Sequence, residues 1–167
     1  RPLRKPLIVL SPKSLLRHPL AVSDMKELAA GKFHHVIDEI DEMDPAGVKR
    51  VVMCSGKVYF DLLEQRRKNE QTDVAIVRIE QLYPFPHDQM QAIVNKYEHV
   101  KDWVWCQEEP QNQGAWYSSQ HRFNDAIPEG AKVTYAGRAA SSSPAVGYLA
   151  VHNQQQKAVV SQALDIN

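Results

Sequence analysis

The segment "VVMCSGKVYFDLLEQRRKNEQTDVAIVRI", residues 51–79, gives the clearest indication of the fold, because its pattern predicts a strand, a helix and a second strand. Its two ends, 51–54 and 74–79, are rich in valine and isoleucine without strict alternation, which is typical of strands covered on both faces. Between them, apolar residues fall on one stripe of a helix, for which Ser55 is the predicted N-cap. The stretch therefore predicts a parallel strand pair joined by a helix.

Further apolar runs extend this alternation in both directions along the chain. The other three predicted strands are residues 7–10, 100–106 and 132–135, the last a candidate antiparallel edge strand. Helical periodicity runs from Met90 to Tyr97, and a final helix is expected over 151–164. The chain is therefore predicted to be α/β: a three-layer sandwich with a mostly parallel five-stranded sheet, helices on both faces and one antiparallel edge strand.

Length and composition narrow the class of protein. At 167 residues, we expect one α/β domain over 1–167. Twenty basic residues balance twenty acidic ones, and no apolar stretch approaches the ~20 residues that span a bilayer, so neither nucleic acid nor a membrane is an expected partner. The two cysteines end apolar runs and are expected to be buried and reduced. Because the chain starts at Arg1 without methionine and soon reaches a core-like run, we expect the C-terminal fragment of a larger multi-domain subunit.

The segment between the first two predicted strands holds a short helix and an acidic stretch. In "LAVSDMKELAAGKF", Ser23 is the predicted N-cap and Gly31 the predicted end of the helix. The following "DEIDEMDPAG" is rich in carboxylates, but their spacing fits no calcium loop. A solvated connecting face is the favoured interpretation of this stretch.

Motifs for cofactor, metal or nucleophilic chemistry are missing from the sequence. It has no G-x-G-x-x-G, Walker, H-E-x-x-H, C-x-x-C or G-x-S-x-G pattern, and the only adjacent histidines, His34 and His35, form a poor metal site. The turn 55–57, Ser-Gly-Lys, either caps a helix or offers backbone N–H groups and one ammonium to an anion. We therefore predict no catalytic, cofactor-binding or metal-ligating residue.

The stretch "WCQEEPQNQGAWY", residues 105–117, allows two interpretations of its paired carboxylates. Glu108 and Glu109 follow a predicted strand, where α/β sheets place ligand sites, and could act as an acid/base pair. However, neighbouring residues of an extended chain point to opposite faces, so a structural role at the end of a strand is favoured. Pro110 is expected to end that strand, and Asn112 to cap a helix. The aromatic residues that gather in 103–123 suit a protein interface.

Five blocks taken together resemble a known family. "PLIVLSPKSLLRHPLAVS", "VVMCSGKVYFDLLEQR", "VAIVRIEQLYPFP", "WCQEEPQNQGAWY" and "SSSPAVGY" look like the C-terminal domain of the decarboxylating component of 2-oxoglutarate dehydrogenase, whose last domain is transketolase-like. The strand-end signature of the resemblance consists of Glu108, Glu109, Asn112, Gln113, Gly114 and Trp116.

The resemblance implies a homodimeric enzyme that decarboxylates 2-oxoglutarate on thiamine diphosphate and Mg²⁺. It then passes the succinyl group to a lipoyl arm of the dihydrolipoyl succinyltransferase core, in the bacterial cytoplasm or the mitochondrial matrix. In that family the cofactor binds another domain through a G-D-G…N-N motif, which this sequence lacks. The resemblance thus implies a domain that contacts its own upstream domains and the second subunit, binds no cofactor and is inactive alone.

Two other functions remain open at this point. The family resemblance offers a regulatory site for acetyl-CoA or adenine nucleotide at Arg17, Lys32 and Gln81, two of which are basic and suit phosphates. Against it, residues 87–89 are His-Asp-Gln, where a phosphate site would want arginines. A small independent hydrolase that uses Glu108 or Glu109 is the remaining alternative.

Overall fold

The computed structural model describes residues 4–165 and divides the chain into two compact units, Arg1–Gly31 and Lys32–Asn167. All five strands and the four longer helices of the described residues belong to the second unit. The assignment of residues 1–167 to one domain stays a prediction.

The first unit contains a 3-10 helix, Lys13–Arg17, and the helix α1, Met25–Ala30, and none of its described residues is buried. Asp24 caps α1 by accepting a hydrogen bond from the Lys26 N–H at 2.7 Å, so the predicted cap at Ser23 was wrong by one residue. Gly31 follows the last turn, as predicted. The predicted strand at 7–10 was also wrong, because among the described residues no strand pairs with this run.

The second unit is built on a sheet with the strand order β1-β3-β2-β4-β5. The strands are β1 (Val36–Ile37), β2 (Arg50–Cys54), β3 (Val74–Ile79), β4 (Asp102–Pro110) and β5 (Lys132–Arg138). β1 pairs antiparallel with β3, and all other pairs are parallel. The mostly parallel five-stranded sheet is therefore confirmed. The antiparallel edge strand is β1, however, and not β5, because the helix between β4 and β5 makes a crossover that returns the chain parallel to β4.

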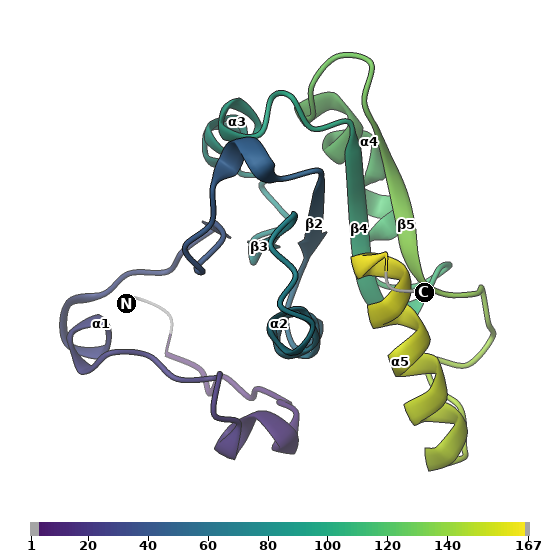
Figure 1. The fold of residues 1–167 in the computed structure, drawn as a ribbon. Helices are drawn as coiled ribbons and strands as arrows, with labels where there is room; N and C mark the ends of the chain where they lie inside the picture. The colour runs from purple at the N-terminus through teal and green to yellow at the C-terminus, as the bar shows by residue number, and fades with distance from the viewer. Residues whose placement is uncertain (1–3, 166–167) are drawn as a thin grey trace. The chain divides into compact units, whose positions relative to one another are not determined.

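Four helices cover the two faces of this sheet. They are α2 (Val58–Lys68), α3 (His87–Lys96), α4 (Trp116–Ala126) and α5 (Leu149–Leu164), and a 3-10 turn lies at Pro45–Gly47. α2 packs beside α5 and α3 beside α4, which gives the predicted three layers (Figure 1). Neither predicted N-cap was right: Lys57 precedes α2 in place of Ser55, and Ala115 precedes α4 in place of Asn112, both without a side-chain cap bond.

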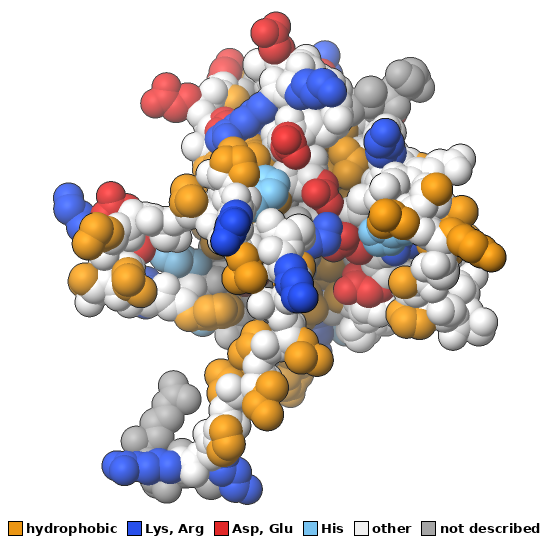
Figure 2. Space-filling model, turned by 90° about the horizontal axis from the view of Figure 1, so that it is seen from below, with side chains coloured by type: hydrophobic (Ala, Val, Ile, Leu, Met, Phe, Trp, Pro, Cys, Tyr) orange, Lys and Arg blue, Asp and Glu red, His pale blue; other side chains and the backbone are white. Residues whose placement is uncertain are grey.

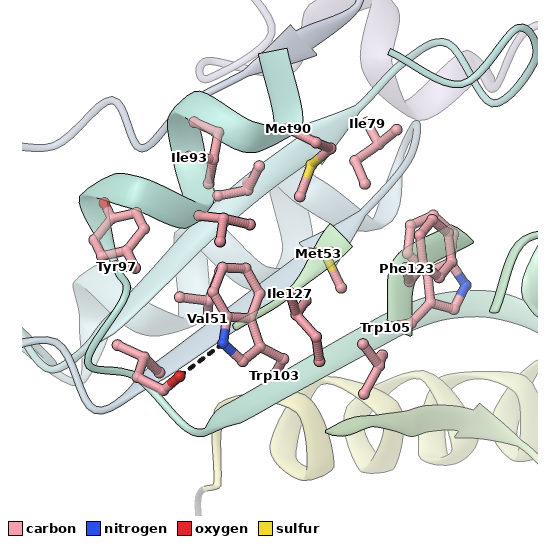
Figure 3. Close-up of a cluster of buried hydrophobic side chains, with 14 of the residues drawn as sticks. Val51, Met53, Ile79, Met90, Ile93, Tyr97, Trp103, Trp105, Phe123 and Ile127 are labelled. Carbon is pink, nitrogen blue, oxygen red and sulfur yellow. Dashed lines mark hydrogen bonds between the residues drawn. The ribbon is translucent and has the colours of Figure 1, made fainter. Parts of the chain in front are cut away.

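The largest aromatic side chains form the core between the sheet and the pair α3 and α4 (Figure 3). Trp103 is fully buried, and its indole N–H donates to the Val100 carbonyl at 2.9 Å. Trp105 stacks on Phe123 with ring centroids 4.5 Å apart. For these three aromatic residues the interface interpretation was wrong, since they are already covered within the chain. A domain of this size gains most from burying its largest apolar side chains.

The acidic stretch is not a solvated face throughout. Arg66 of α2 is buried and forms an ion pair with Glu39, whose side chain is only 2% exposed. Glu39 also accepts a hydrogen bond from the Ile76 N–H at 2.7 Å, and Asp41 binds both Arg66 and Arg67. The solvated interpretation was therefore wrong for Glu39, because two basic side chains of α2 draw this segment onto the domain.

Two further sequence expectations can be compared with the structure. Cys54 and Cys106 are free and buried, as predicted, and are neighbours in the pairing of β2 with β4. Within residues 4–165, no helix combines the length and apolar character needed to cross a bilayer.

Candidate functional site

The carboxyl ends of β2 and β4 form the natural place to look for a ligand site. From β2 the chain crosses to β3 on one side, and it later returns to β4 on the other side of β2. Open α/β sheets bind ligands at such a reversal of strand order. Here Lys57, in the turn 55–57, faces Glu108 of β4, one of the two glutamates that the sequence analysis singled out.

An ion pair occupies this position. The Lys57 ammonium lies 2.8 Å from the Glu108 carboxylate and 2.9 Å from that of Asp61. Burial alone would lower the pKa of Lys57, but the hydrogen bonds to Glu108 and Asp61 outweigh it and raise that pKa. Because two carboxylates already neutralise this ammonium, the geometry argues against anion binding at the 55–57 turn, and α2 starts there without a side-chain cap bond.

Glu108 and Glu109 do not converge on a common point. Glu108 turns to Lys57 and is 22% exposed, whereas Glu109 is exposed. β4 continues to Pro110 with an irregularity between Cys106 and Pro110, so both glutamates lie inside the strand and Pro110 is its last residue. The geometry thus favours the structural interpretation over an acid/base pair.

Gln107 is the polar centre of this region, and the sequence analysis missed it. Its side chain is buried, and its amide oxygen accepts from the Trp105 indole at 2.9 Å and from the backbone N–H groups of Ala115 and Trp116 at 3.2 and 3.0 Å. The amide N–H groups donate to the carbonyls of Glu109, Pro110 and Gln113. Gln107 therefore caps α4, the role predicted for Asn112. Its place two residues after Trp105, on the inward side of the strand, was the available signal.

The residues after Pro110 join β4 to α4 and to the loop that follows β5. Gly114 has φ +65°, and a Cβ there would lie 3.0 Å from the Gln107 amide nitrogen, so glycine fits both the backbone and the space. Asn112 exchanges two hydrogen bonds with the Ser141 backbone, at 3.0 and 2.9 Å, and Gln113 donates to the Ser141 carbonyl at 3.2 Å.

Trp116, the last residue of the signature, begins α4. It is 8% exposed, and its ring packs against Tyr135 of β5 with centroids 5.3 Å apart. Together with Gln107, the segment from Asn112 to Trp116 thus forms a joint that connects β4, α4 and the loop after β5. The contacts within this region therefore account for the strand-end signature as structural residues.

The three residues of the predicted regulatory site are distributed over both units. Arg17 ends the 3-10 helix of the first unit, whereas Lys32 and Gln81 belong to the second. The Gln81 amide donates to the Pro84 carbonyl at 2.7 Å. A nucleotide or acetyl-CoA site at these residues stays a prediction.

Metal and phosphate binding within the described residues can be compared with the cofactors that the family resemblance implies. In residues 4–165, no three His, Cys, Asp or Glu side chains are grouped so that they could hold a metal ion, whereas Mg²⁺ takes oxygen ligands in octahedral geometry. The ammonium of Lys57 is bound by carboxylates and not available to a diphosphate. Burial raises the pKa of the Cys106 thiol to about 12, and that of Cys54 well above its usual range, so neither is an activated nucleophile.

Comparison with known proteins identifies the family. The model of the family described as "2-oxoglutarate dehydrogenase C-terminal" matches residues 22–164. The 2-oxoglutarate dehydrogenase E1 component of Haemophilus influenzae is 66% identical over 164 residues, which are 98% of this chain and 18% of that protein. The protein of the same name from Azotobacter vinelandii is 51% identical over 169 residues, which are 99% of this chain and 18% of that protein.

Among solved structures, a split gene transketolase, an inactive beta4 tetramer, is similar over 71% of this chain and 39% of its own, with 15% identity and a TM-score of 0.48. This chain thus spans 18% of the length of the curated relatives named above. The match of the family model to most of the chain and the high identity to these relatives lead to one conclusion: the chain belongs to the 2-oxoglutarate dehydrogenase C-terminal family.

Proposed function

We propose that this chain is the C-terminal structural and subunit-contact domain of a 2-oxoglutarate dehydrogenase E1 component. The full-length enzyme would decarboxylate 2-oxoglutarate on thiamine diphosphate with Mg²⁺ and transfer succinyl to a lipoyl group of the dihydrolipoyl succinyltransferase core, in the tricarboxylic acid cycle. Family membership and relatives with the name "2-oxoglutarate dehydrogenase E1 component" support this activity. In a bacterium the enzyme would be cytoplasmic, and in a eukaryote it would lie in the mitochondrial matrix.

One observation carries the proposed contact role: the first unit exposes a continuous apolar run. Residues 7–10, Leu-Ile-Val-Leu, are 87%, 83%, 69% and 96% exposed. Figure 2 shows exposed hydrophobic side chains that follow one another in a row on the surface. Burying each such side chain fully is worth roughly 1.5–3 kcal/mol, and contiguous apolar surface of this kind marks a protein contact. The proposed partners are the upstream domains of the same subunit and the second subunit of a homodimer.

Within this proposal, the chemistry belongs to other parts of the full-length subunit. The residues here have a positioning role: Gln107 fixes the start of α4, and the Lys57–Glu108 pair joins β4 to α2. The isolated chain is then expected to be inactive and to bind neither thiamine diphosphate nor Mg²⁺. A thermal shift titration tests this part, since stabilisation of the isolated chain by micromolar cofactor would contradict it.

The contact role is tested by removing apolar surface from the first unit. In the full-length subunit, the double substitution Ile8→Ser and Leu10→Ser should weaken assembly and lower the melting temperature, measured by sedimentation and calorimetry. In the isolated chain the same pair should leave stability unchanged, because both side chains are exposed there. Lys26→Ser, an exposed polar position of α1, is the control. If the double substitution leaves the dimer mass and the melting temperature of the full-length protein unchanged, the run 7–10 does not support a contact role.

A further inference from the structure

Arg138, the last residue of β5, is a half-buried arginine without a carboxylate partner among the described residues. Among the other arginines of the second unit, Arg122 lies over the Tyr83 ring, whereas Arg50, Arg66, Arg67 and Arg78 each lie within 4 Å of an Asp or Glu oxygen. An Arg138 Nη donates instead to Gln156 Oε1 of α5 at 3.0 Å and lies 3.3 Å from His152 Nδ1 of the same helix. Its Nε is buried and has no partner. A guanidinium withdrawn from water normally has a counter-ion, so this group is short of negative charge.

A cavity adjoins this arginine at the carboxyl ends of β4 and β5. Its volume is about 210 Å³, and its polar lining comes from Arg138, Ser141, Ser143 and Gln155. The rest of the wall is apolar or backbone, and no acidic residue lines it. Sites for drug-sized ligands measure ~300–1,000 Å³, so this one suits a small ion or the end group of a larger molecule.

The loop that forms one wall is held in place by the joint described above. Ser141 is fixed by its backbone bonds to Asn112. Its hydroxyl oxygen accepts from the Ser143 N–H at 3.2 Å, which leaves the hydroxyl proton free to be donated to a ligand. The cavity thus combines one cationic group that lacks a counter-ion with a fixed hydroxyl donor.

We infer that this cavity binds an oxyanion: a phosphate or a carboxylate group, either free or as the end of a larger molecule. Arginine presents a planar fork of donors that matches both groups, and an anion would supply the missing counter-charge. The Arg138 guanidinium differs from the Lys57 ammonium, which two carboxylates already satisfy, and Gln156 links the two groups because it also donates to Asp61 at 2.8 Å. The inference is independent of the proposed function, because it concerns donors within this chain.

The side-chain Nε–Hε signals of arginine in nitrogen-15 NMR spectra test it directly. The 167-residue chain is titrated with inorganic phosphate, sulfate and acetate in turn, with chloride keeping the ionic strength constant. We expect a saturable shift of the Arg138 signal at millimolar anion, and no matching shift of Arg122, which lies on α4 against Tyr83. Saturation with phosphate and sulfate alone assigns the site to phosphoryl-type groups, and saturation with acetate extends it to carboxylates.

Variants give a second readout. Arg138→Lys should weaken binding roughly tenfold or more, as expected for the loss of a charge-assisted bond, while Arg122→Lys should not change it. If Arg138→Lys fails to fold, the wild-type titration decides alone, and Ser141→Ala, which keeps the backbone bonds to Asn112, should weaken binding several-fold. A strictly linear shift with every anion, or equal shifts at Arg138 and Arg122, would overturn the inference.

Discussion

Replacing Gln107 by methionine is the most direct test of how the β4–α4 joint is held. Methionine has a similar length and fills the same space, but it cannot accept the three hydrogen bonds that the amide oxygen takes. The donors left behind are the Trp105 indole, at 2.9 Å in the native chain, and the backbone N–H groups of Ala115 and Trp116, at 3.2 and 3.0 Å. All three belong to buried residues.

The magnitude follows from the number of donors. Each buried donor that loses its acceptor costs about 1–3 kcal/mol, so the three together amount to roughly 3–9 kcal/mol. We expect a value near the lower end, about 3–5 kcal/mol, since the first turn of α4 can relax toward water. Against a total stability of ~5–15 kcal/mol for a domain, this is a large fraction.

Urea unfolding of the chain, followed by circular dichroism and tryptophan fluorescence, measures the effect. With a slope of about 2 kcal/mol per molar urea, the midpoint should fall by roughly 1.5–2.5 M. Gln91→Met, on the exposed side of α3, is the matched control and should stay within about 0.5 kcal/mol of the wild type. If Gln107→Met unfolds at the same urea concentration as the control, Gln107 is not what holds the start of α4.

The remaining predictions concern other packed positions of the second unit. Gly114→Ala should lower the free energy of unfolding in urea by about 1–3 kcal/mol, because φ there is +65° and the new Cβ would press on Gln107. The control Gly47→Ala should lower it far less, since no atom lies within 4 Å of the new Cβ. Glu39→Gln should lower the free energy of unfolding by about 3 kcal/mol, because it leaves the buried charge of Arg66 partly uncompensated. An equal loss of stability in Glu42→Gln, at an exposed position, would contradict a special role of this ion pair. The hydrogen bond from Arg67 lowers the pKa of the Asp41 carboxyl below its usual 3.8. The charged carboxylate therefore stabilises the folded chain above pH 3.8, and this stabilisation is lost as the pH falls through the lowered pKa of the folded state. In acid titrations, the free energy of unfolding of Asp41→Asn should therefore depend less on pH than that of the wild type. Burial raises the pKa of both cysteine thiols, that of Cys106 to about 12. A thiol reagent at pH 8 should therefore modify the native protein much more slowly than the urea-unfolded protein. Equal rates of modification would show that the thiols are accessible in the native protein.

Elements with a strong local signal could be predicted from the residues alone. β2, α2 and β3 follow directly from two valine-rich runs around an amphipathic stripe, and the period of Met90, Ile93 and Val94 gives α3, whose buried residues are these same three. Their alternation was enough for a three-layer α/β fold, since short crossovers between buried strands leave few other arrangements. The quoted motif blocks pointed to the family that the comparisons then identified.

The features that could not be predicted depend on partners far away in the sequence. The run 7–10 has the composition of a strand but pairs with none among the described residues, while Val36–Ile37, too short to give a periodic signal, pairs with β3. Gln107 became the cap of α4 because the chain turns back over it, and Glu39 became buried because Arg66 lies across from it. A strand, a cap or an ion pair exists only when a second group completes it, and no local pattern of residues specifies where that group will be.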